Sequence, residues 1–150
     1  MLDDEELRSV GRLAADFAAL ELLTTSMVWR LLGTDEDAAR QITSHLTHDA
    51  LLDLGRRLGR VRLTGQPLNE FEAWLDAVTK LNERRDALIH APWASDVGET
   101  SGLMNLDLFQ GKFRKLPFDR AEFDRLAGDV QSATVRGMVI AAGPRASPRV

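Results

Sequence analysis

Apolar residues recur at alternating spacings of four and three along the first part of the chain, which predicts an amphipathic helix from about Asp3 to Leu32. Asp3 and Asp4 place carboxylates at the positive end of the helix dipole, and Gly33 suits the helix end. The stripe expected to face the core consists of Val10, Ala14, Phe17, Glu21, Thr24, Val28 and Leu31. Glu21 is its one carboxylate, at the centre of an apolar face.

The next segment predicts two shorter helices. Thr34, with Asp37 three residues later, fits a capping box at the start of the first. The pattern breaks near Leu46–Thr47, and Thr47 or His48 then begins a second helix that runs toward Leu63. Its apolar face consists of Leu51, Leu52, Leu54 and Leu58, and its far end carries Arg56, Arg57, Arg60 and Arg62.

After a break at Gly65-Gln66-Pro67, the pattern predicts a third long helix from about Pro67 or Leu68 to His90 or Ala91. Pro92 disfavours helical geometry at the residue before it, so the helix should stop there. The inner stripe consists of Trp74, Val78, Leu81, Arg85 and Leu88, widened by Phe71, Leu75 and Ile89.

Residues 94–117 are irregular, but alternating apolar and polar positions in 104–108 and 109–116, around Gln110-Gly111, predict a small β-hairpin. A last helix should span about Asp119 to Ala142. Its inner face consists of Phe123, Leu126, Val130, Ala133, Gly137 and Ile140. Residues 143–150 are expected to form a flexible C-terminal tail.

Long helices with short connections predict an all-α fold, an antiparallel bundle of four to five helices with the small hairpin before the last one. Residues 1–142 should form this one domain. Some apolar surface is expected to stay exposed and to let two copies pair, as bundles often do.

Composition excludes several classes of function. The net charge of −4 gives no global basic field for nucleic acid, so any such binding has to come from a local patch. The absence of cysteine excludes disulfides and thiol chemistry. The three histidines form no metal-binding motif, so we expect no metal and no cofactor. With no membrane-length apolar run and an acidic N-terminus unlike a signal peptide, the expected location is the cytoplasm.

Two stripes carry a charge where a hydrophobic residue is expected, namely Glu21 in the first helix and Arg85 in the third. Burying an unpaired charge is costly, so each residue needs a partner. The simplest solution is that they pair with each other across adjacent helices.

Arg85 begins a short string that ends in His90. Asp86 and His90 are four residues apart, so they share a helix face, and the carboxylate can fix the histidine tautomer. A histidine that titrates near neutrality beside a permanent cation suits phosphodiester cleavage, in which His90 moves protons and Arg85 neutralises phosphate charge. In the structural interpretation, His90 only caps the last carbonyls and Arg85 only ties two helices together.

The string Arg85-Asp86-x-x-x-His90 resembles the signature of the HEPN superfamily: an arginine, a polar residue, three further residues and a histidine. The longer stretch Leu-Asn-Glu-Arg-Arg-Asp-Ala-Leu-Ile-His-Ala-Pro-Trp looks like HEPN-like bacterial proteins, in which a tryptophan, here Trp93, often follows the histidine. The first helix is similar as well, with Glu21 inside Leu20-Glu21-Leu22. The helical order fits over nearly all of residues 5–142.

This resemblance implies an all-α bundle that forms a homodimer and brings two Arg/His sets to a shared cleft. It also implies a metal-independent endoribonuclease, with a toxin of a toxin–antitoxin pair as one form and an antitoxin-like protein as its partner. His90 would then be the base or acid, Arg85 would stabilise the transition state and Asp86 would tune the pair. Arg84 would touch RNA, and Glu21 and Trp93 would support the site.

Two alternatives stay open at this point. Other HEPN-like proteins keep the fold without cleavage and act as RNA-binding or protein-interaction modules, which fits the acidic net charge. The short motif also fits a helical domain in which it is coincidental. The basic run from Arg56 to Arg62 has two interpretations as well, a phosphate contact or a solvated helix end.

Overall fold

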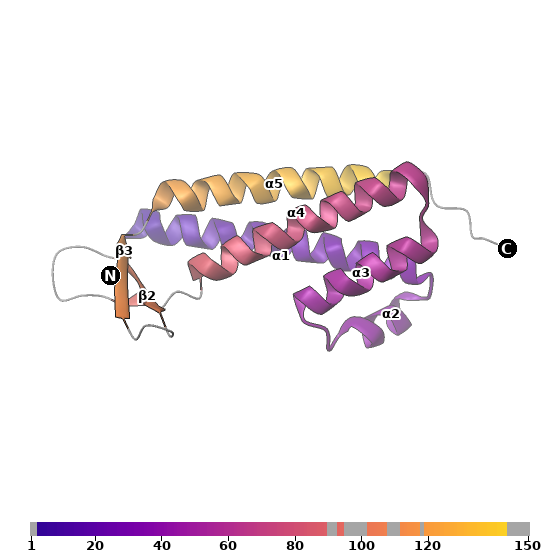
Figure 1. The fold of residues 1–150 in the computed structure, drawn as a ribbon, viewed down its shortest axis with the longest axis horizontal. Coiled ribbons are helices and arrows are strands. Elements are labelled where there is room, and N and C mark those ends of the chain that lie inside the picture. Colours follow the sequence, from indigo (N-terminus) through magenta and orange to yellow (C-terminus); the bar gives the residue numbers. More distant parts are fainter. Residues whose placement is uncertain (1–2, 90–92, 95–101, 108–111, 118, 144–150) are drawn as a thin grey trace.

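The chain forms a helical bundle. The computed structural model describes residues 3–89, 93–94, 102–107, 112–117 and 119–143. The helices are α1 (Asp4–Leu32), α2 (Glu36–Thr43), α3 (His48–Arg62), α4 (Gly65–Ile89) and α5 (Arg120–Ala142). Three short strands follow α4 in the sequence and precede α5: β1 (Trp93–Ala94), β2 (Gly102–Asp107) and β3 (Lys112–Pro117). In space, β2 and β3 lie at the end of the bundle where α1 begins (Figure 1). The prediction of an α-helical bundle is confirmed.

The five helices do not alternate in direction throughout. α4 runs opposite to α5, since Trp74 bonds Ala133 while Arg84 bonds Asp129. α1 and α5 run in the same direction, because Ser9 bonds Asp124 and Gln131 bonds Asp16, a constant offset of 115 residues (Figure 1). The segment between α4 and α5 therefore returns the chain to the end of the bundle where α1 begins.

The three strands pair antiparallel in the order β1-β2-β3. In the pairing of β2 with β3, Gly102 lies opposite Pro117 and Asp107 lies opposite Lys112. This is the segment for which the sequence predicts a hairpin, and the turn expected at Gln110-Gly111 lies outside the described residues. Residues 144–150, expected to form the tail, also lie outside them.

The helix ends follow capping chemistry, with two corrections. At α1, Asp3 accepts from the amides of Glu5 and Glu6, and Gly33 closes the helix with a φ of 68°, as predicted. The cap of α2 is Asp35 and not Thr34, since the Asp35 side chain accepts from the Ala38 amide. α4 begins at Gly65, earlier than predicted, because a proline in the first turn of a helix costs no hydrogen bond.

The remaining boundaries lie close to the predicted ones. Thr47 caps α3 through the Ala50 amide, and Asp119 caps α5 through the Glu122 amide. The segment from 34 to 63 is thus two helices, as predicted.

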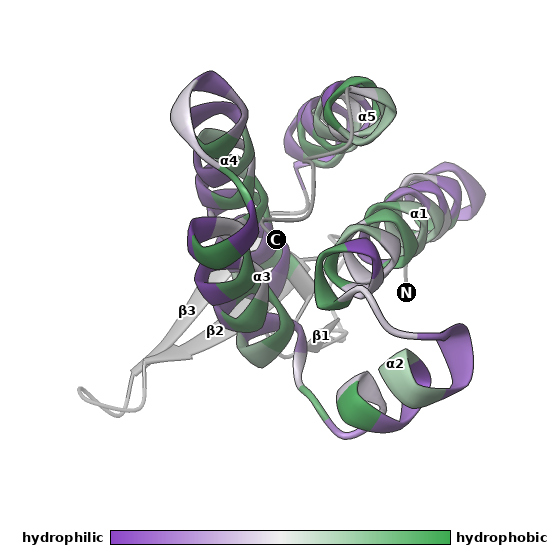
Figure 2. Ribbon diagram, turned by 90° about the vertical axis from the view of Figure 1, so that its right-hand side faces the viewer, coloured by the Kyte–Doolittle hydropathy of each residue, from purple (hydrophilic) through white to green (hydrophobic). Residues whose placement is uncertain are grey.

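Trp74 is at the centre of the core. It is fully buried, stacks on Phe71 with ring centroids 6.1 Å apart, and donates its Nε1 hydrogen to the Ala133 carbonyl at 2.8 Å. Gly137 allows α5 to approach this ring, because a Cβ there would lie 2.7 Å from Trp74 Cζ2. Seen end-on, α1, α4 and α5 lie around a common centre (Figure 2).

The predicted stripes of α4 and α5 are buried as expected. The buried positions are Trp74, Val78 and Leu81 on α4 and Phe123, Leu126, Val130, Ala133 and Gly137 on α5. The prediction for α1 is wrong at Ala14, which is exposed. Leu13, Leu20 and Met27 fill the core in its place. The inward face of α1 therefore keeps Phe17, Thr24 and Val28 of the predicted stripe and extends to positions one residue before it. None of the helices in the described ranges is both long and apolar enough to cross a membrane.

Candidate functional site

Arg85 lies near the end of α4, on the inner side of the helix, with its side chain 20% exposed. Its Nη1 lies 2.8 Å from Oε1 of Glu21 on α1 and donates a hydrogen bond to it. The predicted pairing of these two residues is therefore confirmed. It links the middle of α1 to the end of α4 at a point where both helices carry a charge on an apolar face.

A second carboxylate and an aromatic ring fix the guanidinium further. Nε and Nη2 of Arg85 both donate to Oδ1 of Asp86, at 3.1 and 3.0 Å. The guanidinium carbon lies 5.1 Å from the centroid of the Phe17 ring, within range for a cation–π contact. Three of the five donors of Arg85 are thus directed to two carboxylates, and one face of its plane is covered.

His48, for which the sequence predicts a place at a helix start and no metal-binding role, joins this cluster from α3. It is the first residue of that helix, and its side chain is 13% exposed. Its Nδ1 lies 4.0 Å from Oε1 of Glu21, the same oxygen that accepts from Arg85. The sequence signal for its position is the Thr47 cap, which places the next residue at the start of a helix packed against α1.

The electrostatics of the cluster favour a neutral His48 and a charged Arg85. Burial lowers the pKa of His48 below its ordinary value, and the nearby Arg85 lowers it further, against the opposite effect of Glu21. Burial also opposes the charge of Arg85, but the hydrogen bonds to Asp86 and Glu21 prevail and raise its pKa. We name Glu21, His48, Arg85 and Asp86 the Arg85 cluster.

The free energy of unfolding is expected to fall as the pH drops below 6.5, the ordinary pKa of histidine. The folded pKa of His48 is depressed, so between that pKa and 6.5 the unfolded chain binds more protons and gains stability. Urea titrations from about pH 5 to pH 8 measure this change. His48→Asn should flatten the dependence, whereas the same change at exposed His45 should leave it intact. An unaltered dependence in His48→Asn would contradict this account.

Arg84 faces a different way from Arg85, because adjacent residues point about 100° apart around a helix. Its Nη1 and Nη2 donate to Asp129 at 2.6 Å and Glu122 at 2.9 Å on α5. The hydrogen bond from Arg84 lowers the pKa of Glu122. These bonds tie α4 to α5, and the contact of Arg84 with RNA stays a prediction.

The structure describes the other two predicted site residues less fully. Trp93 is the first residue of β1, and its backbone pairs with that of Leu103. His90 lies outside the described residues. The structure thus brings together Glu21, Arg85 and Asp86 and adds His48 to them.

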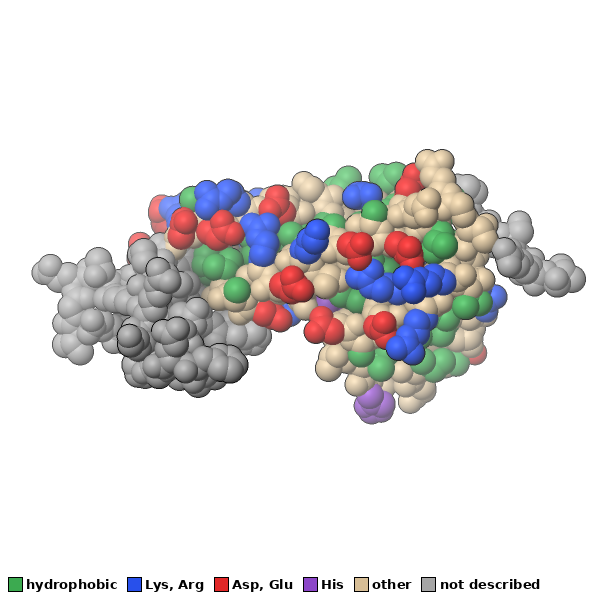
Figure 3. Space-filling view, in the orientation of Figure 1, with side chains coloured by type: hydrophobic (Ala, Val, Ile, Leu, Met, Phe, Trp, Pro, Cys, Tyr) green, Lys and Arg blue, Asp and Glu red, His purple; other side chains and the backbone are tan. Residues whose placement is uncertain are grey.

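Three of the four arginines at the end of α3 pair with carboxylates, and Arg62 donates to the Leu32 carbonyl instead. Arg56 bonds Asp76 at 2.5 Å and Arg60 bonds Glu72 at 2.7 Å, both on α4, while Arg57 pairs with Asp53. Acidic and basic side chains lie next to one another over α3 and α4 (Figure 3). The interpretation as a solvated, ion-paired helix end fits this arrangement better than a phosphate-binding patch.

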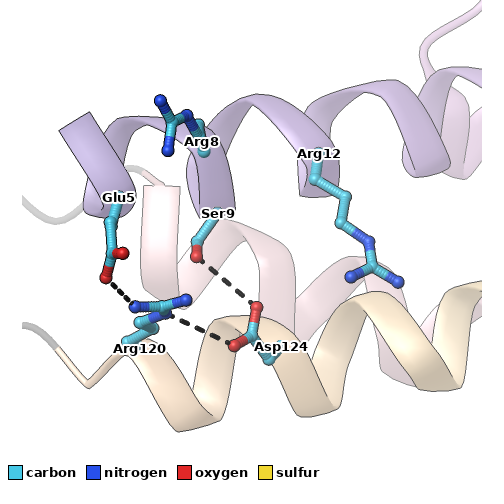
Figure 4. Close-up of a pocket in the computed structure, with 6 residues that line it drawn as sticks. All are labelled: Glu5, Arg8, Ser9, Arg12, Arg120 and Asp124. Atoms are coloured by element: carbon cyan, nitrogen blue, oxygen red, sulfur yellow. Dashed lines mark hydrogen bonds and ion pairs between the residues drawn. The ribbon is translucent and has the colours of Figure 1, made fainter.

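A polar groove of about 220 Å³ lies between the first turns of α1 and α5 (Figure 4). There Arg120 bonds Glu5 and pairs with Asp124, which also accepts from Ser9 at 3.4 Å. These contacts join the two parallel helices at one end. Within the described ranges, no group of three or more His, Cys, Asp and Glu side chains could hold a metal ion.

Comparison with known proteins found no family model, no curated protein and no solved structure that matches this chain.

Proposed function

We propose that this chain is a HEPN-like, metal-independent endoribonuclease whose site is the end of α4. The observation that carries the proposal is the position of Arg85, held by Glu21 and Asp86 beside a second ionisable histidine, His48. Five residues further along the sequence stands His90. A fixed arginine with histidines nearby supplies charge stabilisation and proton transfer, which are the two requirements of phosphodiester cleavage without a metal.

In the proposed reaction, the 2′-hydroxyl of RNA attacks the adjacent phosphorus. The bond from the 2′-oxygen to phosphorus forms and the bond to the 5′-oxygen breaks, which leaves a 2′,3′-cyclic phosphate and a 5′-hydroxyl. His90 accepts the proton of the 2′-hydroxyl or supplies the one that the leaving oxygen takes up. Arg85 binds the phosphate oxygens as their charge grows, and Asp86 keeps its plane in position.

The phosphate would bind the N–H groups of Nη1 and Nη2 that the carboxylates leave, since only three of the five donors of Arg85 are directed to Glu21 and Asp86. Within this proposal, Glu21 keeps Arg85 in position, and Arg84 and Trp93 contribute RNA contacts.

The proposal includes a cytoplasmic homodimer, with a cognate antitoxin-like protein as a further partner. Its support is the apolar surface left open on two neighbouring helices. Leu22 of α1 and Val135, Met138 and Val139 of α5 are all exposed. Exposed apolar side chains on the outside of a bundle are available for pairing with another surface.

Single-stranded RNA incubated with the purified protein and EDTA should be cleaved, and His90→Ala should abolish the cleavage. The physical reason is that the substitution removes the proton-transferring group, which contributes a factor of about 10²–10⁴ to such reactions. His45→Ala, at an exposed histidine outside the cluster, is the matched control and should cleave normally. Cleavage that survives in His90→Ala would show that the assignment is wrong.

A second candidate is a non-catalytic, HEPN-like dimeric module that binds RNA or a protein. The observation that favours it is that two carboxylates already pair with Arg85, while Arg56, Arg57 and Arg60 of α3 are each paired with a carboxylate. It predicts no turnover by the parent protein at any pH. In that case, Arg85→Ala would change only stability and binding.

A further inference from the structure

His48 shares one carboxylate oxygen with Arg85. Oε1 of Glu21 accepts from Arg85 Nη1 at 2.8 Å and lies 4.0 Å from His48 Nδ1. The longer distance is the outer limit of an ion pair, so a neutral imidazole interacts weakly while a protonated one is strongly attracted. The interaction of His48 with this site therefore depends on its proton.

Two contacts hold His48 in that place. The Thr47 side chain caps α3 through the Ala50 amide, which sets the first turn of the helix. Asn82 of α4, itself 5% exposed, donates from Nδ2 to Asp49 at 3.2 Å and ties that turn to the helix that carries Arg85. The imidazole and the guanidinium thus approach Glu21 from two helices that are fixed to each other.

We propose that His48 is a positioning residue of this site, which acts from the first turn of α3 on the Glu21 carboxylate and through it on Arg85. While the imidazole is neutral, the Glu21 carboxylate stays hydrogen-bonded to Arg85. When the imidazole is protonated, it attracts the Glu21 carboxylate away from Arg85, which then loses one of the two carboxylates that orient it.

The groups around His48 support this assignment. Glu21 of α1 and Asp49 and Asp86 favour its protonation, while Arg85 opposes it, and burial opposes it most. The start of α3, with its positive dipole end, also disfavours a cation there. Near neutral pH, His48 is therefore uncharged, and Arg85 stays oriented.

The consequence for catalysis rests on the proposed function. At neutral pH, His48→Ala and His48→Asn should both cleave at nearly the parent rate, because the neutral imidazole leaves the Glu21 carboxylate bound to Arg85. At acid pH, the parent should lose rate as His48 takes up its proton. In both variants the acid limb of the pH–kcat profile should lose one ionisation, because neither alanine nor asparagine can take up that proton.

One further variant serves as a control. His45→Ala, three residues earlier and exposed, should show the parent profile.

A measurement on the protein alone separates this inference from the proposed function. In an NMR titration, Glu21→Gln should lower the pKa of His48 further, because the carboxylate that favours its protonation is gone. A His48 pKa that is the same in Glu21→Gln, or a His48→Ala enzyme with the parent pH–kcat profile, would overturn the inference. A parent protein that cleaves no RNA would overturn the proposed function, and the titration would then decide the coupling of His48 to Glu21 on its own.

Discussion

Replacing Arg85 with alanine is expected to lower kcat/KM for RNA cleavage by about 10²–10³-fold, the usual cost of removing one donor that stabilises an oxyanion. The fold should survive, because the two carboxylates left behind are 41% and 44% exposed and water can solvate them. The free energy of unfolding should fall by only about 1 kcal/mol. Initial rates on a single-stranded RNA, together with urea titration, measure both effects.

Lysine at position 85 should not restore the rate. Arg85 reaches Glu21 with Nη1 and Asp86 with Nε and Nη2, a fork that a single ammonium cannot reproduce. Arg136→Ala, at an exposed arginine of α5 outside the cluster, is the matched control and should cleave like the parent. If Arg85→Ala cleaves RNA at the parent rate, Arg85 is not part of the catalytic site.

Trp74→Ala is expected to lower the free energy of unfolding by about 3–5 kcal/mol, the range for truncating a large buried aromatic side chain. The ring is fully buried between α4 and α5, and the change leaves both a cavity and an Ala133 carbonyl without its donor. Chemical denaturation followed by circular dichroism measures the loss. Leu22→Ala, at a leucine that is 69% exposed, should cost almost nothing in the same experiment. Equal losses in the two variants would contradict the packing described for α4 and α5.

The inner faces of α4 and α5 could be predicted from periodicity, because their buried positions are apolar apart from Asn82 of α4. α1 was harder to predict, since alanines and leucines alternate around much of its surface. Ala14 and Leu13 fit a helical stripe equally well, and only the packing of α4 and α5 against α1 decides that Leu13 is buried. The relative direction of α1 and α5 likewise depends on the tertiary path of the chain and has no local signal.

The pair of Glu21 and Arg85 could be predicted because each charge interrupts an apolar stripe and needs an opposite partner. His48 carried no comparable signal, since the start of a helix is normally solvated and only the packing of α3 buries it. Arg84 shows the same limitation. Its neighbours in the sequence suggest that Arg84 belongs to the site. Its side chain, however, points from α4 toward α5, where it pairs with Glu122 and Asp129.

The ends of the RNA fragments test the central claim most directly. After incubation of single-stranded RNA with the parent protein in EDTA, the account predicts fragments with 2′,3′-cyclic phosphate and 5′-hydroxyl ends. It predicts at least about a hundredfold fewer fragments from Arg85→Ala and none from His90→Ala. Fragments with 3′-hydroxyl and 5′-phosphate ends, cleavage that requires a divalent metal, or intact RNA would contradict it.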